Sequence, residues 1–262
     1  MSRFIESLTK LHKPEPQPLG FATGSPARAR ARLPVAVILG SRNLDKILEN
    51  IGEVEGVMVR VTGPEDLKAV QRTCQDKNNP PAGGLITETQ KELLEDISAD
   101  SCDFVALPAE APVKLSEQEK LGRILQVDSG LSEALLRTIN DLPIDAALFS
   151  PGWGEKSLSL ADLMTVRRLA LLISKPILLV VPPTLSQSEL QALWDLGISG
   201  LVVDVPDAAT SRKLGELRKN LEKLSLPSLR RKDKVSPILP RMSAEAAPPV
   251  EKEDDGEEEE DY

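Results

Sequence analysis

The sequence predicts an α/β chain that forms one (β/α)₈ TIM barrel, followed by an acidic, disordered C-terminal tail. Eight short apolar runs alternate with amphipathic stretches of about 8–16 residues, which is the spacing of strands and helices. The length of 262 residues fits a barrel of about 250 residues with short tails. Hydrophobic residues make up 40% of the chain and aromatic residues only 3%. The core must therefore be aliphatic, as in parallel strands that are buried on both faces.

Residues 1–32 are predicted to form an N-terminal amphipathic helix and a linker. Four apolar residues recur at helical spacing on one face of Met1–Lys13: Phe4, Ile5, Leu8 and Leu11. Lys13–Leu19 is rich in proline, which is typical of a linker. We expect the helix to close the bottom of the barrel, and contact with a membrane surface is the alternative.

Residues 33–225 are predicted to form the barrel. The expected strands are Pro34–Leu39, Val57–Val61, Ala82–Ile86, Asp103–Leu107, Arg123–Val127, Ile144–Phe149, Pro176–Val181 and Gly200–Val205. The third strand is the weakest, because Gly83 and Gly84 lower its β-propensity. The expected helices are Asn43–Asn50, Pro64–Gln75, Thr89–Ser98, Lys114–Lys120, Leu131–Asp141, Leu158–Ser174, Gln187–Leu196 and Thr210–Leu224.

Strict alternation of strands and helices requires right-handed crossovers and a parallel sheet, and eight strands close a barrel. An open doubly wound sheet is the alternative, but no G-x-G-x-x-G motif follows any strand. Capping boxes support the helix starts at Thr89–Glu92, Ser159–Asp162 and Ser186–Glu189. Pro64 suits a first helical turn, and Gly197 suits the end of a helix.

Several segments resemble known barrel families. Leu193–Asp204 resembles the last helix-to-strand unit of aldolase-type barrels, among them thiamine-phosphate synthase and keto-deoxy-phosphogluconate aldolase. Gly122–Leu136, Leu190–Trp194 and the basic exit into an acidic tail resemble an uncharacterised bacterial barrel family more closely. The second resemblance spans nearly the whole chain. It implies an aldolase-type barrel and no particular activity.

Charge is distributed unevenly along the chain. Glu251–Tyr262 holds nine acids and one lysine, so nearly all of the net charge of −9 lies in this segment. Arg212–Arg241 holds ten basic residues and three acidic ones. Residues 226–262 are therefore predicted to be a disordered tail, first basic and then acidic. The basic stretch lacks interleaved aromatics and adjoins acids, which disfavours nucleic-acid binding.

Other features indicate a cytoplasmic protein. Met1–Lys13 is charged throughout and lacks the apolar core of a signal peptide. No run approaches about 18 apolar residues, so a transmembrane segment is not expected. Cys74 and Cys102 lie far apart, in no metal-binding spacing, which is typical of buried, reduced thiols.

Barrel enzymes react at the carboxyl ends of the strands, so candidate site residues are sought there. The ligand-binding candidates that follow predicted strands are Ser41, Arg42, Ser150, Trp153 and Thr184. The candidate acids are Glu110, Asp128 and Asp204. Trp153 stands between two glycines, where it either closes over a ligand or folds back on the barrel rim.

The fifth strand carries the most informative polar residues. Ile124, Gln126 and Asp128 share one face by the two-residue period, which predicts that they line the interior near the mouth. Glu110 follows the neighbouring strand, and two close carboxylates can bind Mg²⁺ or divide acid and base roles. In the alternative interpretation, Asp128 caps the next helix and Glu110 is a solvated loop residue.

Some chemistries are disfavoured. The single histidine, His12, precedes the barrel, which argues against histidine catalysis and His-bound zinc. No lysine lies in the sixth strand, where the aldolase resemblance would place a Schiff base. The loops after strands seven and eight contain prolines and Asp207 instead of glycines, so a phosphate is held only weakly, near Thr184.

Two function classes follow from these residues. The first is a barrel that binds a small molecule or a protein partner and lacks the usual catalytic residues. The alternative is a Mg²⁺-assisted lyase or isomerase acting on a small oxo-acid, with Glu110, Asp128 and Asp204 as acids and Arg42 as the anion contact. The missing histidine, lysine and glycine loop favour the first. The substrate and the oligomeric state do not follow from the sequence.

Overall fold

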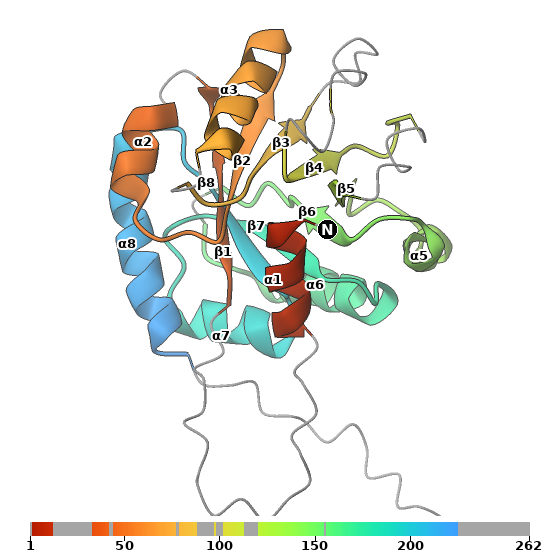
Figure 1. The fold of residues 1–262 in the computed structure, drawn as a ribbon. Coiled ribbons are helices and arrows are strands. Elements are labelled where there is room, and N and C mark those ends of the chain that lie inside the picture. The colour runs from red at the N-terminus through yellow and green to blue at the C-terminus, as the bar shows by residue number, and fades with distance from the viewer. Residues whose placement is uncertain are drawn as a thin grey trace, which may run out of the picture. The chain divides into compact units, whose positions relative to one another are not determined.

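The computed structural model describes residues 2–12, 33–41, 44–76, 79–87, 97, 102–112, 120–154 and 156–224. Eight parallel strands pair in sequence order, and β8 pairs with β1, so the sheet is a closed barrel (Figure 1). The strands are β1 (Val35–Leu39), β2 (Gly56–Val61), β3 (Ala82–Ile86), β4 (Phe104–Leu107), β5 (Gly122–Val127), β6 (Ala146–Phe149), β7 (Ile177–Val181) and β8 (Gly200–Asp204). The predicted TIM barrel is confirmed, with every strand within two residues of its expected bounds.

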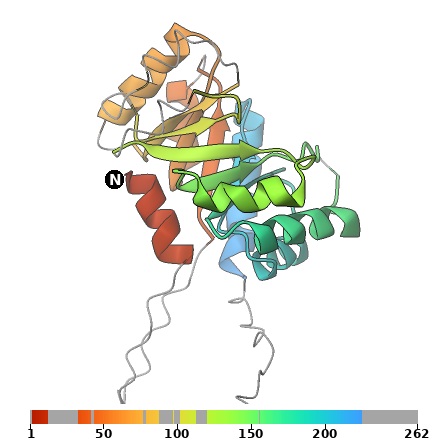
Figure 2. The ribbon, with the colours of Figure 1, turned by 90° about the vertical axis from the view of Figure 1, so that its right-hand side faces the viewer.

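The helices cover the outside of the barrel, apart from the first (Figures 1 and 2). They are α1 (Arg3–His12), α2 (Leu44–Ile51), α3 (Pro64–Gln75), α5 (Glu133–Thr138) with the 3₁₀ helix η3 (Ile139–Asp141), α6 (Leu160–Leu172), α7 (Gln187–Asp195) and α8 (Ala208–Glu222). The helices expected at Thr89–Ser98 and Lys114–Lys120 and the expected tail lie almost wholly outside the described residues. No described helix is long and apolar enough to cross a membrane.

The strands bury both faces, as their uninterrupted apolar runs predict. One face packs against the surrounding helices and includes Val37, Val59 and Leu179. The other fills the barrel interior: Ala36, Ile38, Met58, Leu85, Phe104, Ala106, Ile124, Ala146, Leu148, Leu178 and Val202. Within the described residues, the interior of the barrel is therefore a packed core.

Helix α1 closes the amino end of the barrel, as predicted. Phe4, Ile5 and Leu8 are buried in the interior cluster, and the ring of Phe4 lies 4.6 Å from that of Phe104. The carboxylate of Asp103 accepts hydrogen bonds from the Ser2 hydroxyl at 2.7 Å and from the backbone N–H groups of Arg3 and Phe4 at 2.9 and 3.0 Å. This carboxylate caps the start of α1 and fixes the helix to β4.

Glycines at the amino ends of the strands make room for this closure. A β-carbon on Gly56 would lie 2.7 Å from the ring of Phe4, and one on Gly122 would lie 2.7 Å from Ile5. A β-carbon on Gly83 would lie 2.4 Å from the ring and carbonyl of Phe104. The glycine that weakened the prediction of β3 is thus required by a close approach of β4.

Helix starts follow the predicted signals, although α5, α6 and α8 each begin two residues from their expected first residue. The capping boxes at Ser159–Asp162 and Ser186–Glu189 are both formed, Pro64 begins α3, and Gly197 has a φ of +100°. Helix α5, expected from Leu131, begins at Glu133. Its cap is Ser132, because the carboxylate of Asp128 instead accepts the N–H of Gly130 at 2.7 Å within a turn.

Candidate functional site

A cavity of about 670 Å³ lies at the carboxyl end of the barrel. Each of the eight strands, or the loop directly after it, contributes to its lining. Ile38, Leu85 and Leu148 form an apolar floor that continues the interior core. Polar groups surround this floor: Arg60, Thr87, Glu110, Gln126, Asp128, Ser129, Ser150 and Asp204. An apolar base with a few polar groups is the usual composition of a small-molecule site.

An ion pair crosses the mouth of the barrel. Arg60 of β2 donates to the carboxylate of Asp204 of β8 at 2.8 Å, and the two side chains are 44% and 45% exposed. Strand β1 pairs with both β2 and β8, so the pair spans β1. The residue that follows β1, beside Arg60, is Gly40, and a β-carbon on Gly40 would meet nothing within 4 Å. The pair holds the guanidinium over the cavity without filling the space above β1.

Arg60 was not among the predicted site residues. It lies two residues after the buried Met58, so the two-residue period already places it on the interior face. A cation on the interior face of a barrel strand is the signal that would have identified it. Asp204, which was predicted, shares the cavity with it.

Gln126 is held in place by neighbouring backbone. Its side-chain amide donates to the carbonyl of Ile86 at 2.7 Å and to that of Ala106 at 3.1 Å. These bonds satisfy a partly buried amide and tie the ends of β3 and β4 to β5. The predicted interior face of β5 is present, since Ile124 is buried in the core and Gln126 and Asp128 line the cavity above it.

The predicted acids line one cavity, and their chemistry is constrained. Glu110 and Asp128 are exposed at its edge, with Asp128 bonded to the N–H of Gly130, and Asp204 is paired with Arg60. Among the described residues, no three or more His, Cys, Asp or Glu side chains are arranged to hold a metal ion. Neither histidine nor lysine lines the cavity within the described part of the chain. Ser150 lies at the boundary with a further cavity.

A second cavity, of about 910 Å³, adjoins the first beside β1 and β2. Ser41 lines it together with Arg60 and Asp204, whereas Arg42 lies outside the described residues. Asp66 also lines it. Burial raises the pKa of this carboxyl, but hydrogen bonds from Ser41, Thr62 and Gly63 outweigh burial and hold the pKa below its usual value. Asp66 therefore stays ionised and fixes the loop after β2.

A third cavity, of about 340 Å³, lies beside the loop after β6. Trp153 lines it but also packs against the barrel core, and its indole N–H helps to lower the pKa of Asp162. Gly152 and Gly154 on either side have φ values of +66° and +61°. The tryptophan is thus folded back on the rim while one face borders the cavity. Asp204 lines all three cavities.

The helix starts near Thr184 already carry carboxylates. Thr184 is exposed and does not line the three cavities. Glu189 accepts the N–H groups of Ser186 and Leu158 at the start of α7, and Asp207 accepts that of Thr210 at the start of α8. A phosphate at either helix start would face these negative charges.

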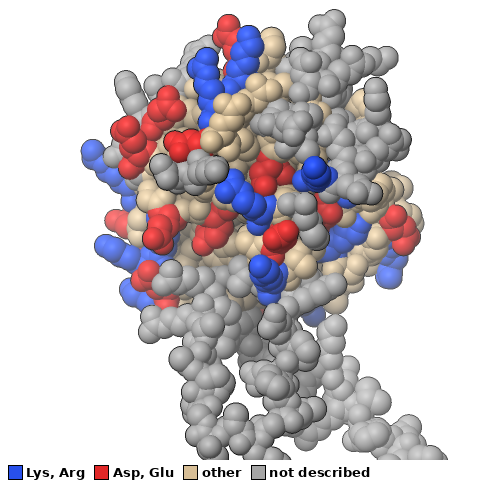
Figure 3. Space-filling model, viewed as in Figure 1, with Lys and Arg blue, Asp and Glu red and all other residues tan. Residues whose placement is uncertain are grey.

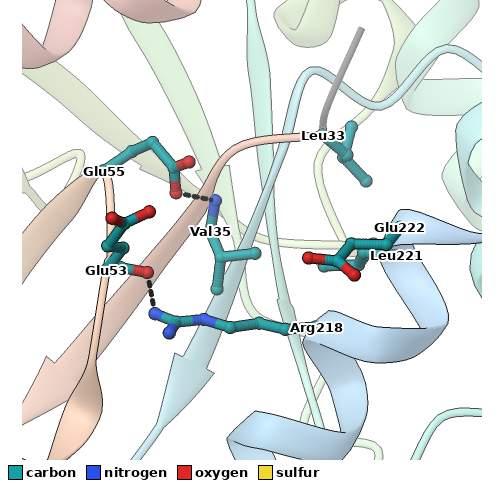
Figure 4. Close-up of a pocket in the computed structure, with 7 residues that line it drawn as sticks. All are labelled: Leu33, Val35, Glu53, Glu55, Arg218, Leu221 and Glu222. Carbon is teal, nitrogen blue, oxygen red and sulfur yellow. Dashed lines mark hydrogen bonds between the residues drawn. The ribbon is translucent and has the colours of Figure 1, made fainter. Parts of the chain in front are cut away.

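A smaller pocket, of about 240 Å³, lies at the opposite end of the barrel (Figure 4). The carboxylate of Glu55 accepts the backbone N–H of Val35 at 2.8 Å, and the guanidinium of Arg218 donates to the carbonyl of Glu53. These groups satisfy one another and join the starts of β1 and β2 to α8. The pocket is structural, because Glu55 and Arg218 are bonded to backbone, and Lys175, which precedes β7 at the same end, likewise donates to the carbonyl of Ile144 at 2.9 Å.

The fold is shared with tryptophan synthase structures. Tryptophan synthase from M. tuberculosis, in an open form with BRD0059 bound, matches 86% of this chain and 100% of its own with a TM-score of 0.58 and 14% identity. A mutant alpha-subunit from Pyrococcus furiosus matches 74% of this chain and 98% of its own with a TM-score of 0.56 and 11% identity. A protein from Aquifex aeolicus matches 85% and 98% with a TM-score of 0.54 and 13% identity.

The sequence itself gives no match. No protein-family model matches the chain, and no curated protein matches it. The particular families that the sequence resembles are therefore not confirmed. At 11–14% identity the structural likeness shows the fold alone: the chain is a TIM barrel.

Proposed function

We propose that this barrel binds a small oxo-acid at its carboxyl end and holds the acid group through Arg60, without catalysing a reaction on it. One observation carries the proposal: a guanidinium is held over a cavity of about 670 Å³ by its ion pair with Asp204. Guanidinium has five donors, and the pair with Asp204 uses one of its two terminal nitrogens. The remaining donors suit a carboxylate in the bidentate geometry that arginine prefers.

The rest of the cavity supports a small, partly apolar ligand. Ile38, Leu85 and Leu148 offer contact to a short carbon chain, and Ser150 and Thr87 offer hydroxyl groups for a carbonyl oxygen. The lining lacks histidine and lysine among the described residues, which favours binding over acid–base chemistry. We keep Ser41, Arg42 and Trp153 as further contacts and place no phosphate at Thr184.

A Mg²⁺-assisted lyase or isomerase is the second candidate. It is favoured by the position of Glu110, Asp128 and Asp204 around one cavity. In this case Glu110 and Asp128 would hold Mg²⁺, the metal would supply Lewis-acid polarisation of the oxo-acid carbonyl, and Asp204 would orient Arg60 toward the carboxylate of the ligand. Asp128 would offer Oδ2 to the metal while its Oδ1 keeps the bond from Gly130.

The first experiment is titration calorimetry with pyruvate, oxaloacetate and 2-oxoglutarate, with and without Mg²⁺. We expect one of these acids to bind, and Arg60→Gln to weaken its binding at least tenfold, since a hydrogen bond to a charged group contributes about 1.5–3 kcal/mol. Arg72→Gln is the matched control, because Arg72 is exposed on α3 away from the mouth. Equal affinity in the Arg60 and Arg72 variants would contradict the proposed anion contact.

One further variant tests the binding site, and a further measurement separates the two candidates. Gly40→Leu fills open space beside the ion pair, so it should abolish binding while leaving the fold intact. If Mg²⁺ raises the Tm and NMR shows the bound acid being consumed, the lyase or isomerase is correct. An unchanged acid and no response to Mg²⁺ support the binding protein.

Partner and compartment remain predictions. On the face in Figure 3, acidic and basic residues of the described part lie intermingled, which does not favour nucleic acid as a partner. Cys74 and Cys102 do not form a disulfide. This is compatible with the predicted cytoplasmic location.

A further inference from the structure

Helix α6 is apolar on its outer face as well as its inner face. Val166, Leu169 and Leu172 are buried against the barrel. On the opposite side, Leu160 is 80% exposed, Met164 73% and Leu171 63%. At 3.6 residues per turn these three positions fall within an arc of about 40° and form one stripe along the helix. A helix that is apolar all round is normally buried.

The other large exposed hydrophobic side chains lie on elements next to α6 in sequence. The described part of the chain has five large hydrophobic side chains that are exposed, and all lie on α5, on α6 or just after η3: Leu135, Leu142, Leu160, Met164 and Leu171. Helices α5 and α6 are in contact and lie side by side (Figures 1 and 2). We call these five residues the α5–α6 surface. Scattered apolar side chains are ordinary, but such a concentration marks an interface.

We propose that the α5–α6 surface is the interface of a homodimer, in which it packs against the same surface of a second copy with the two α6 helices antiparallel. In this arrangement Leu160 of one copy contacts Leu171 of the other, and the two Met164 side chains lie near the two-fold axis. The stripe is self-complementary, because both of its ends carry leucine. Isologous two-fold contacts are the commonest form of association between identical chains.

Charges on the two helices also fit an antiparallel pair. The acids Glu133 and Asp162 lie in the first turns, whereas Arg137 lies in the last turn of α5 and Arg167 and Arg168 lie just past the middle of α6. Antiparallel packing places the first turn of each α6 beside the arginine-bearing half of the other and opposes the helix dipoles favourably.

The arginines do not block the stripe. Arg167 donates to the carbonyl of Leu196 at 3.2 Å, which holds its guanidinium toward the end of α7. Arg168 donates to the carbonyl of Ser129 at 2.7 Å, which holds it toward the loop before α5. The outer face is therefore left to Leu160, Met164 and Leu171.

The size of the surface predicts a weak dimer. Helix α6 has 13 residues and is about 20 Å long, and α5 and α6 side by side are about 20 Å wide. The α5–α6 surface therefore covers at most roughly 400 Å², which is below the roughly 800 Å² that each partner buries in a standard interface. The dimer should therefore form in a concentration-dependent way, and independently of ligand binding at the mouth.

Sedimentation equilibrium of the full-length chain tests the proposal. We expect wild type to change from monomer to dimer with rising concentration, and Met164→Glu and Leu171→Glu each to raise the dimer Kd at least tenfold. Glu216→Lys, an exposed charge change on α8, should leave the Kd unchanged. Because the substituted side chains are exposed, the variants should keep the wild-type circular dichroism spectrum.

A cross-linking experiment tests the geometry. Met164→Cys lies near the proposed axis and should form a disulfide-linked dimer under mild oxidation, whereas Ala209→Cys on α8 and wild type should not. A wild type that stays monomeric up to millimolar concentration would overturn the proposal and indicate that something else covers the surface. A dimer that is indifferent to both glutamate variants would overturn it as well.

Discussion

At the residue scale, glycines and charged residues make the two ends of the barrel different. At the amino end, Gly56 and Gly122 remove side chains so that α1 can enter, and a β-carbon at either would lie 2.7 Å from an atom of α1. At the carboxyl end, Gly40 leaves open space, and Arg60 and Asp204 bring charge to the mouth. One end is thus closed by packing, and the other is kept open and polar.

Gly56→Ala should destabilise the protein by about 1–3 kcal/mol, because the added methyl group forces the buried ring of Phe4 to shift. Gly40→Ala is the control and should be neutral or slightly stabilising, since nothing lies within 4 Å of the new atom. Urea unfolding midpoints compare the two. Phe4→Leu should partly rescue Gly56→Ala in a double-mutant cycle, and purely additive effects would argue against the proposed clash.

At the scale of the element, carboxylates anchor the helix starts. Hydrogen bonds from the Ser159 hydroxyl and backbone lower the pKa of Asp162, and a bond from the Thr210 backbone does the same for Asp207. Burial raises the pKa of Glu189, but hydrogen bonds from Ser186 and Leu158 outweigh it. The caps at Ser159–Asp162 and Ser186–Glu189 were visible in the sequence because the motif is local, with two residues between its partners.

The lowered pKa values predict a pH dependence of stability. Each ionised cap stabilises the fold above its ordinary pKa, 3.8 for Asp162 and 4.5 for Glu189, and that stability is lost as the pH falls through the lower folded value. Ser159→Ala and Ser186→Ala should each cost about 1 kcal/mol at pH 7. Urea unfolding at pH 7, 4 and 3 should show a smaller acid-induced loss in the double variant. An identical loss in wild type would mean that other carboxyls control it.

At the scale of the whole molecule, the barrel accounts for the ordered core. Residues Met1–Ser228 form one compact unit, and the buried hydrophobic core extends from Phe4 to Leu217. The predicted boundaries at residues 32 and 225 stay predictions, because the chain on both sides of them lies outside the described residues.

Truncation after Met242 tests the predicted tail. We expect the Tm to be unchanged, because residues 243–262 are rich in Ala, Pro, Glu and Asp and offer little apolar surface to bury. Solubility should fall, since ten acids and one lysine are removed from a chain whose net charge is −9. A Tm lowered by several degrees would show that the tail contributes to the folded structure.

Local sequence patterns were sufficient to predict the barrel and the ends of most of its elements. The signals that predicted these elements are local: the alternation of apolar runs with helical periods, caps such as Ser186–Glu189, and the helix start at Pro64. Local signals can be recognised without knowledge of tertiary contacts. The sequence also identified the helix that plugs the barrel, since Phe4, Ile5 and Leu8 share one face. It placed Glu110, Asp128 and Asp204 at strand ends, which the barrel then brought around one cavity.

Only the tertiary structure decided which groups meet. Arg60 reaches Asp204 across 144 positions of sequence, Asp103 caps a helix about 100 residues earlier, and Gln126 ties together three strands. The sequence also could not predict that Leu160, Met164 and Leu171 are exposed. An apolar helix has the same composition whether its outer face is exposed to solvent or covered by another element. Such pairings depend on barrel closure and register, and no sequence period encodes them.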